Sequence, residues 1–580
     1  MSDSNSDSNN LAKEKFIEAD AGDGTTREEQ YLHGAPLLAC ILSLFLNMFL
    51  VGLDQTIVST VLTNVSNDFH SFDKASWAAT GFLLPMTVLT AIWGKLSIAF
   101  GRKYLLLGAT LVFEAGSLMC ALSQNMNTFI GGRVIAGIGG SCIQSLCFII
   151  VAEVVNMNLR PLIMAFFGLI MGVSIVLGPL IGGALTSGTT WRWCFYINLP
   201  IGGVAMVAFF FSFNPPLPKF NLRQKLAMID YTGVFILAVG LTLFLLGMTF
   251  GSSRQYDWDS AAAISCLVIG GIFSILFCVW NFKLSKFPLI PWEVVKIPQL
   301  SAAVFSGFGM FSYFMVSILY LSIYFQNVLG KNALHTGISL LPFIVATSVA
   351  AISSGILVRV TSLVKPFIIL GTVLIVVGTG LISMLEVDST TSQQIGYLIL
   401  GGVGNGILLQ GQLVAAQLKA PKTEGGLILT TTYLMFGRNL GSTVSTILGD
   451  VVYNTSLKHI LPGAVNGLKS TNPDLYQQVM SVTPDTLATS TAILGTLSEE
   501  ARHFIRLQMM HSIKNVFYMG IGLAGLSFIA GLFTTNKKLP KAHEIGSAHD
   551  KDEDKELVET TEINDEKELG TSRDIDSDKV

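Results

Sequence analysis

The 580-residue chain is 51% hydrophobic and only 13% charged, and its mean hydropathy is +0.58. Soluble domains carry about 25% charged residues, so this composition excludes an ordinary soluble domain and predicts a protein embedded in a lipid bilayer. The net charge of -3 comes from charges in the tails and short loops, which form no basic patch, so we expect no nucleic-acid partner.

The sequence gives no sign of a bound group. The seven cysteines lie mostly in apolar runs, with no C-x-x-C pair, and they predict packing residues rather than disulfides or a zinc site. No phosphate-binding G-x-x-x-x-G-K-[ST] loop and no hydrolase nucleophile elbow occurs in the sequence. We therefore expect no enzyme, metal or cofactor.

Both ends of the chain are polar. Residues 1–36 are acidic and serine-rich without a secretory signal pattern, and residues 535–580 are dense in charges of both signs. Such segments cannot bury enough apolar surface to fold alone. We expect two disordered cytosolic tails.

Fourteen apolar segments of membrane-spanning length lie between the tails. They cover residues 37–63, 76–96, 104–123, 128–154, 162–185, 195–213, 231–250, 261–281, 300–325, 337–358, 366–385, 394–418, 427–452 and 513–534. The expected fold is an all-α integral membrane protein. It has a six-helix bundle at 37–213, a linker with two inserted helices at 214–299, and a second six-helix bundle at 300–534. A large non-cytosolic loop is expected at 453–512.

The distribution of basic residues in the short loops predicts the orientation. Lys and Arg are concentrated in the loops on one side, at Lys95, Arg102, Lys103, Arg160, Lys219, Arg223, Lys225, Lys283, Lys286, Lys296, Arg359, Lys365, Lys419 and Lys422. The loops on the other side contribute Lys74, Arg192, Arg254 and Lys331. Cytosolic loops carry the excess of positive charge, so both termini should face the cytosol.

Ionisable residues inside the apolar segments are functional candidates, because burying them in a membrane is expensive. Asp54 in helix 1 and Arg133 in helix 4 lie at compatible depths for pairing. The pair is a candidate for proton exchange, and the alternative is a fixed ion pair that joins two helices. Glu114 in helix 3 has no basic neighbour in sequence, and we expect it to be protonated or bonded to a neighbouring helix, in a structural role or a coupling one. Arg438 in helix 13 is either a cavity cation or an interfacial residue.

Helix 5 contains "GPLIGG" at residues 178–183 within a strip of small residues. Small residues let membrane helices approach closely. Gly178 and Gly182 share one face, Gly183 extends it, and Pro179 should bend it. The strip is either ordinary helix packing or the surface on which two halves slide.

Polar and aromatic residues suggest a cargo surface. Tyr313 and Tyr320 lie in helix 9, Asn405 and Gln410 in helix 12, and Gln144 in helix 4. Rings with a polar tip beside amides suit bulky amphipathic or cationic compounds, although a tyrosine stripe is also typical of packing or of an interfacial belt.

Several motifs together resemble a family. "FLLPMTVLTAIWGKLSIAFGRK" (82–103) and "SLLPFIVATSVAAISSGILVRVTSLVK" (339–365) suggest a repeat of two halves. "GKLSIAFGRK" (94–103), "RVIAGIGG" (133–140) and "GPLIGG" resemble signatures of the major facilitator superfamily. "LDQTIVSTVL" (53–62) and "WRWCFYINLPIGG" (191–203) are similar to its fungal drug:proton antiporter branch with fourteen helices.

The resemblance implies roles for individual residues. Gly94, Gly101, Arg102 and Lys103 fall in the loop signature, whose usual acid and arginine are replaced here by Ile98 and Ala99. Glu153 is available as a partner for Arg102 or Lys103 instead. The helix 4 signature has Ala136 where many members carry glutamine. The family's helices 1 and 4 line the cavity, which makes Asp54 and Arg133 the leading site for proton coupling.

The sequence thus predicts a monomeric, proton-coupled exporter of drugs or other toxic small amphipathic or cationic compounds, most simply in the plasma membrane. A vacuolar transporter of basic amino acids is the first alternative, because fungal relatives of similar pattern do this. A membrane sensor or scaffold that does not transport is the second.

Overall fold

The computed structural model of the chain describes residues 32–71, 74–155, 159–215, 229–252, 258–331, 333–421, 423, 425–480, 482 and 497–537. The described residues form helices and connecting turns, with no strand among them. Most of the two predicted tails, 1–36 and 535–580, and part of the linker lie outside these ranges.

The first bundle matches the six segments predicted between residues 37 and 213. Its helices are α2 (Gly34–Asp68), α3 (Ala75–Phe100), α4 (Arg102–Ala121), α5 (Met126–Val154), α6 (Arg160–Gly188), α7 (Trp193–Tyr196) and α8 (Asn198–Ser212). The sixth predicted helix is divided at Ile197 into α7 and α8. Pro200 explains the division, because it has no N–H to donate to the preceding turn.

Two inserted helices and the second bundle follow. The insert contains α10 (Tyr231–Ser252), α11 (Ala261–Val279) with a π-helical end η3 (Trp280–Leu284), and the short α12 (Trp292–Val295). The second bundle contains α13 (Pro298–Ile323) with η4 (Tyr324–Val328), α14 (Ala333–Thr361), α15 (Lys365–Ser383), α16 (Thr391–Gln417), α17 (Gly426–Thr471), α18 (Pro473–Val479) and α20 (Glu499–Leu532).

Thirteen helices in the described residues are long and apolar enough to cross a membrane. The fourteenth is α17, which packs on α13 and α3 inside the assembly although its sequence is less apolar. Its polar residues include the buried Arg438 and Asn439. These polar side chains lower the mean hydropathy of α17. They are tolerated in a spanning helix because they face protein rather than lipid.

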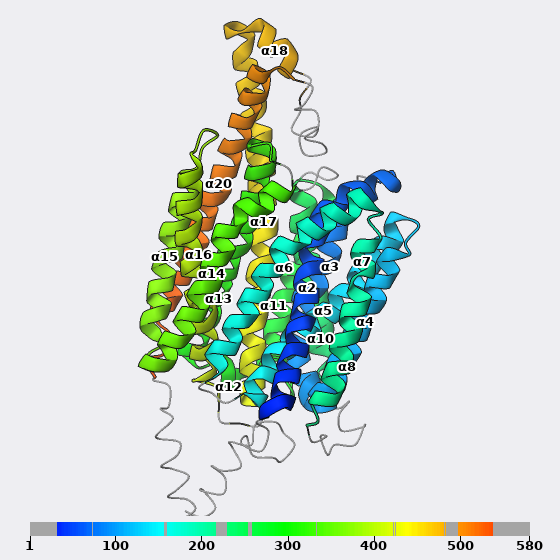
Figure 1. Ribbon diagram of the computed structural model, residues 1–580, viewed down its shortest axis with the longest axis vertical. Coiled ribbons are helices and arrows are strands. Elements are labelled where there is room, and N and C mark those ends of the chain that lie inside the picture. The colour runs from blue at the N-terminus through cyan, green and yellow to red at the C-terminus, as the bar shows by residue number, and fades with distance from the viewer. Residues whose placement is uncertain are drawn as a thin grey trace, which may run out of the picture.

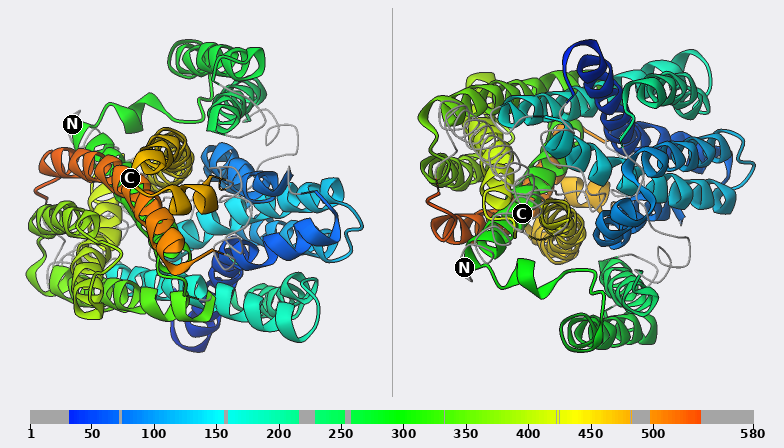
Figure 2. Two further views of the ribbon diagram at one scale, coloured as in Figure 1. Left: turned by 90° about the horizontal axis from the view of Figure 1, so that it is seen from above. Right: turned by 90° about the horizontal axis from the view of Figure 1, so that it is seen from below.

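The two bundles lie side by side (Figures 1 and 2), and their helices pack in the same internal arrangement. In the first, α2 packs on α6 and α8, and α5 packs on α3 and α4. In the second, the corresponding helices do the same, since α13 packs on α17 and α20, and α16 packs on α14 and α15. Across the seam α3 contacts α17 and α14 contacts α6, so the second helix of each bundle packs on the fifth helix of the other. This confirms the two similar halves predicted from the sequence.

The connection predicted as a loop at 453–512 is helical over most of its described residues, and its non-cytosolic location stays a prediction. α17 continues to Thr471, α18 follows, and α20 begins at Glu499. Figure 1 shows this helical extension rising beyond the other helices. Buried apolar residues such as Leu457, Leu461 and Ile505 belong to one core that continues into the extension, which explains why the helices continue beyond the ends of the others.

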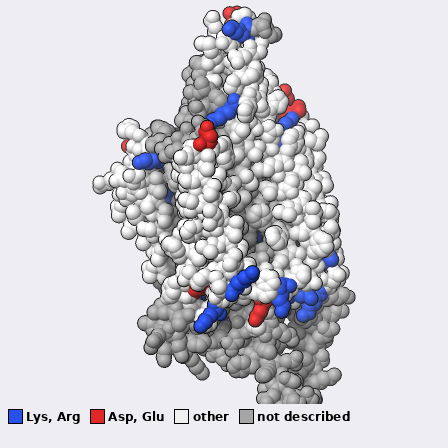
Figure 3. Space-filling model, turned by 180° about the vertical axis from the view of Figure 1, so that it is seen from behind, with Lys and Arg blue, Asp and Glu red and all other residues white. Residues whose placement is uncertain are grey.

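The opposite end of the molecule is the one where α3 joins α4 and α14 joins α15, and we call it the basic end. Arg102, Lys103, Arg359 and Lys365 lie in or beside these junctions. Figure 3 shows Lys and Arg side chains gathered toward that end on one face of the molecule. The charge distribution is the one expected if the basic end faces the cytosol.

Candidate functional site

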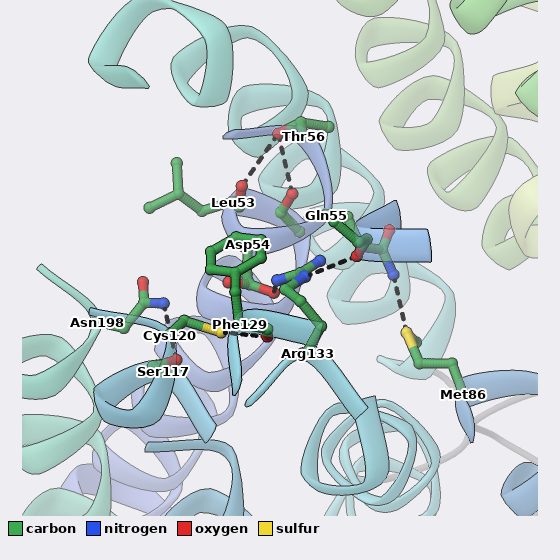
Figure 4. A network of polar contacts seen from close by, with 12 residues as sticks. Leu53, Asp54, Gln55, Thr56, Met86, Ser117, Cys120, Phe129, Arg133 and Asn198 are labelled. Carbon is green, nitrogen blue, oxygen red and sulfur yellow. Dashed lines mark hydrogen bonds and ion pairs between the residues drawn. The ribbon is translucent and has the colours of Figure 1, made fainter. Parts of the chain in front are cut away.

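A buried ion pair joins α2 and α5 within the first bundle (Figure 4). Arg133 Nη1 lies 2.5 Å from Asp54 Oδ2, and the two residues are 1% and 0% exposed. The predicted pairing is therefore confirmed. Arg133 Nε also donates to the Ala78 carbonyl oxygen at 3.2 Å, and the guanidinium lies 4.4 Å from the centroid of the Phe82 ring.

The carboxylate of Asp54 is only partly satisfied. Its Oδ2 accepts from Arg133, whereas its buried Oδ1 has no hydrogen-bond partner among the described residues. Buried carboxylate oxygens normally accept a hydrogen bond, because a buried oxygen without a donor lowers the stability of the fold. Oδ1 is thus a buried acceptor that no described donor satisfies.

Among the described residues, Glu114 forms no hydrogen bond with Asp54 or Arg133. The residue lies on α4, is 6% exposed, and neither carboxyl oxygen has a hydrogen-bond partner among the described residues. The expected bond to a neighbouring helix is therefore not found there. The carboxyl group instead lies against the backbone of Gly202 on α8, at a spot that the Cβ of any other residue would occupy.

A cavity lies between the two bundles and is lined by residues of both. Its polar lining comes from Gln144, Thr347, Asn405, Gln410, Arg438 and Asn439. Its apolar lining includes four phenylalanines and five methionines, namely Phe148, Phe167, Phe311, Phe314, Met48, Met164, Met171, Met310 and Met435. Such a mostly apolar pocket with a few polar groups is typical of a small-molecule site.

The cavity brings together four of the six predicted cargo residues, Gln144, Asn405, Gln410 and Arg438. Arg438 is 1% exposed, so it does not extend to the membrane interface. Tyr313 and Tyr320 do not line the cavity, and their assignment to it is corrected here. Tyr313 is fully buried in the core of the second bundle, and the Tyr320 hydroxyl is bonded to Asp450 Oδ1 at 2.9 Å.

The sequence analysis missed the methionines and Asp450. The methionines are spread from residue 48 to residue 435, so no local pattern unites them. Asp450 carried a usable signal, since it is a carboxylate within a predicted apolar segment.

A polar network also missed from the sequence crosses the seam between α3 and α17. Asn439 Nδ2 donates to Thr90 Oγ1 and to Gln144 Oε1, both at 2.9 Å. The hydroxyl oxygens of Thr87 and Thr443 are 2.5 Å apart. The network thus joins the two bundles beside the cavity.

Close packing continues from this network toward the basic end. A Cβ on Gly94 would collide with the Thr432 side chain of α17, and Ile98 contacts Gly425, whose φ of 71° suits glycine. The bundles are therefore closed together at the basic end along α3 and α17.

The predicted partner of Glu153 is Arg102. Arg102 Nε donates to Glu153 Oε1 and Oε2 at 2.8 and 2.9 Å. Lys103 instead donates to the Phe210 carbonyl oxygen at 2.6 Å and to Asn214 Oδ1. Gly101, between α3 and α4, has a φ of 84°, which requires glycine at this tight turn.

The GPLIGG stretch of α6 packs within its own bundle. Gly178 lies against Thr56 and Ile57 of α2, the Gly182 carbonyl oxygen accepts from Thr186 Oγ1 at 2.5 Å, and Gly183 has open space beside it. Pro179 lies inside the uninterrupted helix α6. Of the two expectations for this stretch, this arrangement shows helix packing within the bundle at Gly178, and a role as the sliding surface between the halves stays a prediction.

Glycines nearer the middle of α6 face the other bundle instead. A Cβ on Gly172 would lie 2.6 Å from Ile344 Cγ2 of α14, and a Cβ on Gly168 would lie 3.2 Å from Leu409 Cδ1 of α16. Close approach of the two bundles along α6 therefore depends on Gly168 and Gly172.

Residues 44–446 match the model of the Major Facilitator Superfamily. Among similar proteins is one named vacuolar basic amino acid transporter 5, from Saccharomyces cerevisiae, which is 33% identical over 90% of this chain and 94% of its own length. Azole resistance protein 1 from the same yeast is 31% identical over 89% and 91%. Efflux pump dotC from Dothistroma septosporum is 31% identical over 88% and 86%.

A solved structure has a similar fold. It is the crystal structure of the human organic anion transporter MFSD10 (TETRAN), with a TM-score of 0.52 and 14% identity. The match covers 86% of this chain and all of the other. At this identity the likeness concerns the fold alone.

Proposed function

The chain belongs to the Major Facilitator Superfamily, and on this premise we propose that it is a proton-coupled antiporter that exports small amphipathic compounds from the cytosol. It is a multi-pass membrane transporter protein, and its relatives include proteins named for azole resistance and for efflux. We propose the plasma membrane as its location and a monomer as its working unit.

The observation that supports proton coupling is the Asp54–Arg133 ion pair, in which Asp54 Oδ1 has no hydrogen-bond partner among the described residues. Both helices of the pair also line the cavity, since α2 supplies Met48 and α5 supplies Gln144. Asp54 lies six residues beyond Met48 along α2, about 9 Å farther from the basic end. Protonation of Asp54 would remove the charge that holds Arg133, and the docking of α2 on α5 would change beside the cargo.

The mechanism we propose alternates between two states of this pair. A proton from the outside binds Asp54 while the basic end is closed along α3 and α17. The weakened pair lets the bundles rock about the cavity, and the proton leaves when the basic end opens. Cargo then occupies the cavity while Asp54 is charged, so export and proton entry are linked.

The test is Asp54→Asn in proteoliposomes with an imposed pH gradient. The amide keeps the shape but cannot titrate, so we expect gradient-driven transport to fall to background while the protein remains folded. Asp388→Asn, which changes an exposed carboxylate between α15 and α16, is the matched control and should transport normally. Transport by Asp54→Asn that follows the pH gradient as in the unmodified protein would refute the assignment.

A second candidate is vacuolar transport of basic amino acids, which the relative of that name favours. The two candidates differ in cargo and place. Uptake of arginine and lysine into proteoliposomes, together with the location of the tagged protein in cells, distinguishes them. Uptake of these amino acids and a vacuolar location would favour the second candidate.

A further inference from the structure

The described residues of the cavity wall carry charge of one sign only. Its described lining contains one cation, Arg438, and no carboxylate. Arg133 has its own counter-ion in Asp54 and is not part of this lining. The cavity therefore holds a net positive charge in a mostly apolar space.

Arg438 is held in place by neutral groups. Its Nη2 donates to the Leu409 carbonyl oxygen at 3.0 Å, and its guanidinium carbon is 5.2 Å from the centroid of the Phe311 ring. Its buried Nε has no hydrogen-bond partner among the described residues. Arginine stays charged in proteins, so a buried guanidinium without a carboxylate has strong capacity to bind an anion.

The acid on the same helix does not supply the missing charge. Asp450 lies twelve residues from Arg438, about 18 Å along α17, and it accepts a hydrogen bond from Tyr320. Glu114, on α4, is likewise absent from the cavity lining.

Amide groups beside Arg438 have spare hydrogen-bonding capacity. Asn405 is 1% exposed, and neither its side-chain oxygen nor its nitrogen has a partner among the described residues. Gln410 Oε1 is also buried without one. Unmet polar atoms around a cavity point to a ligand that meets them. Asn405 lies four residues, about one helical turn, before Leu409, whose carbonyl oxygen holds Arg438, so Asn405 Nδ2 is a second donor on this part of the wall, and the amide oxygens can accept from hydroxyls of the ligand.

The rest of the wall selects the body of the ligand. Four aromatic rings offer flat apolar surface, and the flexible methionine side chains can adapt to different shapes. A ligand that contacts both the apolar wall and Arg438 has an aromatic or aliphatic body with one anionic group.

Building on the proposed export function, we propose that this cavity selects amphipathic organic anions, such as aromatic carboxylates and phenolates, over cations of the same size. Arg438 and Asn405 are the specificity-determining residues. Arg438 binds the anionic group through its planar N–H donors, and a cationic ligand meets a like charge with no carboxylate to offset it.

Two xanthene dyes of similar size test the preference. Fluorescein is an anion at neutral pH, and rhodamine 123 is a cation on the same ring system. Binding of each to the purified full-length protein in detergent is measured by fluorescence polarisation, without a pH gradient. We expect fluorescein to bind at least about tenfold more tightly than rhodamine 123. Equal binding, or tighter binding of rhodamine 123, would overturn the proposal.

Variants locate the preference in the cavity. Arg438→Gln should weaken fluorescein binding at least about tenfold and leave rhodamine 123 binding unchanged or tighter, and Arg438→Lys should lie between. Arg359→Gln, which removes an exposed arginine at the basic end, should change neither. Equal weakening of both dyes by Arg438→Gln would mean a structural role and would refute the proposal.

A second variant covers the case in which Arg438→Gln does not fold. Asn405→Leu removes the second donor of the wall and should also reduce the ratio of fluorescein to rhodamine 123 binding, whereas an unchanged ratio would count against the proposal.

Binding measured without a pH gradient is independent of proton coupling. Anion binding without pH-driven flux would refute the proposed antiport and leave the selectivity intact, and pH-driven flux of cations alone would do the reverse.

Discussion

At the scale of single residues, the buried charges in the first bundle are explained by their partners. Asp54 pairs with Arg133 farther from the basic end, and Arg102 pairs with Glu153 at the basic end. Each pair joins two different helices, α2 with α5 and α4 with α5. Removing one member of a buried pair is more damaging than losing a surface contact, because the other charge remains buried.

Substitutions of Arg133 separate charge from geometry. Arg133→Lys keeps the positive charge but loses the Nε bond to Ala78, so we expect reduced transport. Arg133→Ala leaves Asp54 buried and unpaired, at a cost of about 3 to 5 kcal/mol, so transport should be lost and thermal unfolding in detergent should occur earlier. Arg359→Ala is the exposed control. Normal transport and stability in both Arg133 variants would show that the pair is dispensable.

At the scale of helices, glycine decides which faces can meet. On α6 the outer glycine Gly178 fits against α2, whereas Gly172 fits against α14 of the other bundle. On α3, Gly94 allows contact with α17. One helix can therefore serve both the interior of its bundle and the seam, because different turns carry the small residues.

Leucine at two positions of α6 distinguishes the seam between the bundles from a position with open space beside it. Gly172→Leu places several atoms where Ile344 already lies, so we expect transport per folded molecule to fall by at least about tenfold, with Gly172→Ala intermediate. Gly183→Leu enters open space and should transport at a near-normal rate. Flux in proteoliposomes, normalised to correctly folded protein, gives the comparison. The opposite ranking would favour GPLIGG as the sliding surface.

At the scale of the whole molecule, the two bundles meet along two equivalent seams. The inserted helix α10 packs on both α3 and α17 and so covers one of these seams. The polar network of Thr87, Asn439 and Thr443 lies on the same seam. In the proposed mechanism, rocking of the bundles separates these contacts when the basic end opens.

A cross-link across that seam tests the rocking motion. The Thr87 and Thr443 hydroxyl oxygens are 2.5 Å apart, so cysteines at both positions should form a disulfide on oxidation. We expect the oxidised double variant to stop transport and a reductant to restore it. A protease site inserted in the linker between the bundles reveals the bond, because the cut halves then stay together on a non-reducing gel. Full transport by the cross-linked protein would rule out opening along this seam, and each single variant serves as control.

The sequence by itself determined the helical class, the order of the spanning segments and the pairing of Asp54 with Arg133. These properties depend on the length of apolar runs and on the depth of a charge along a helix, and both can be counted along the chain. The helical extension beyond the membrane was not predictable in this way, since its core forms between α17 and α20 rather than within one apolar run.

Only the tertiary structure decided which side chains share the cavity. Its lining combines residues of both bundles, from Met48 on α2 to Asn439 on α17, and excludes the tyrosines that the sequence had favoured. Helical periodicity places a residue on a face of its own helix, but the partner of that face depends on how the bundles pack. The packing of the bundles likewise places Gly178 against its own bundle and Gly172 at the seam. It also places Arg438 at the cavity, whose described lining contains no carboxylate.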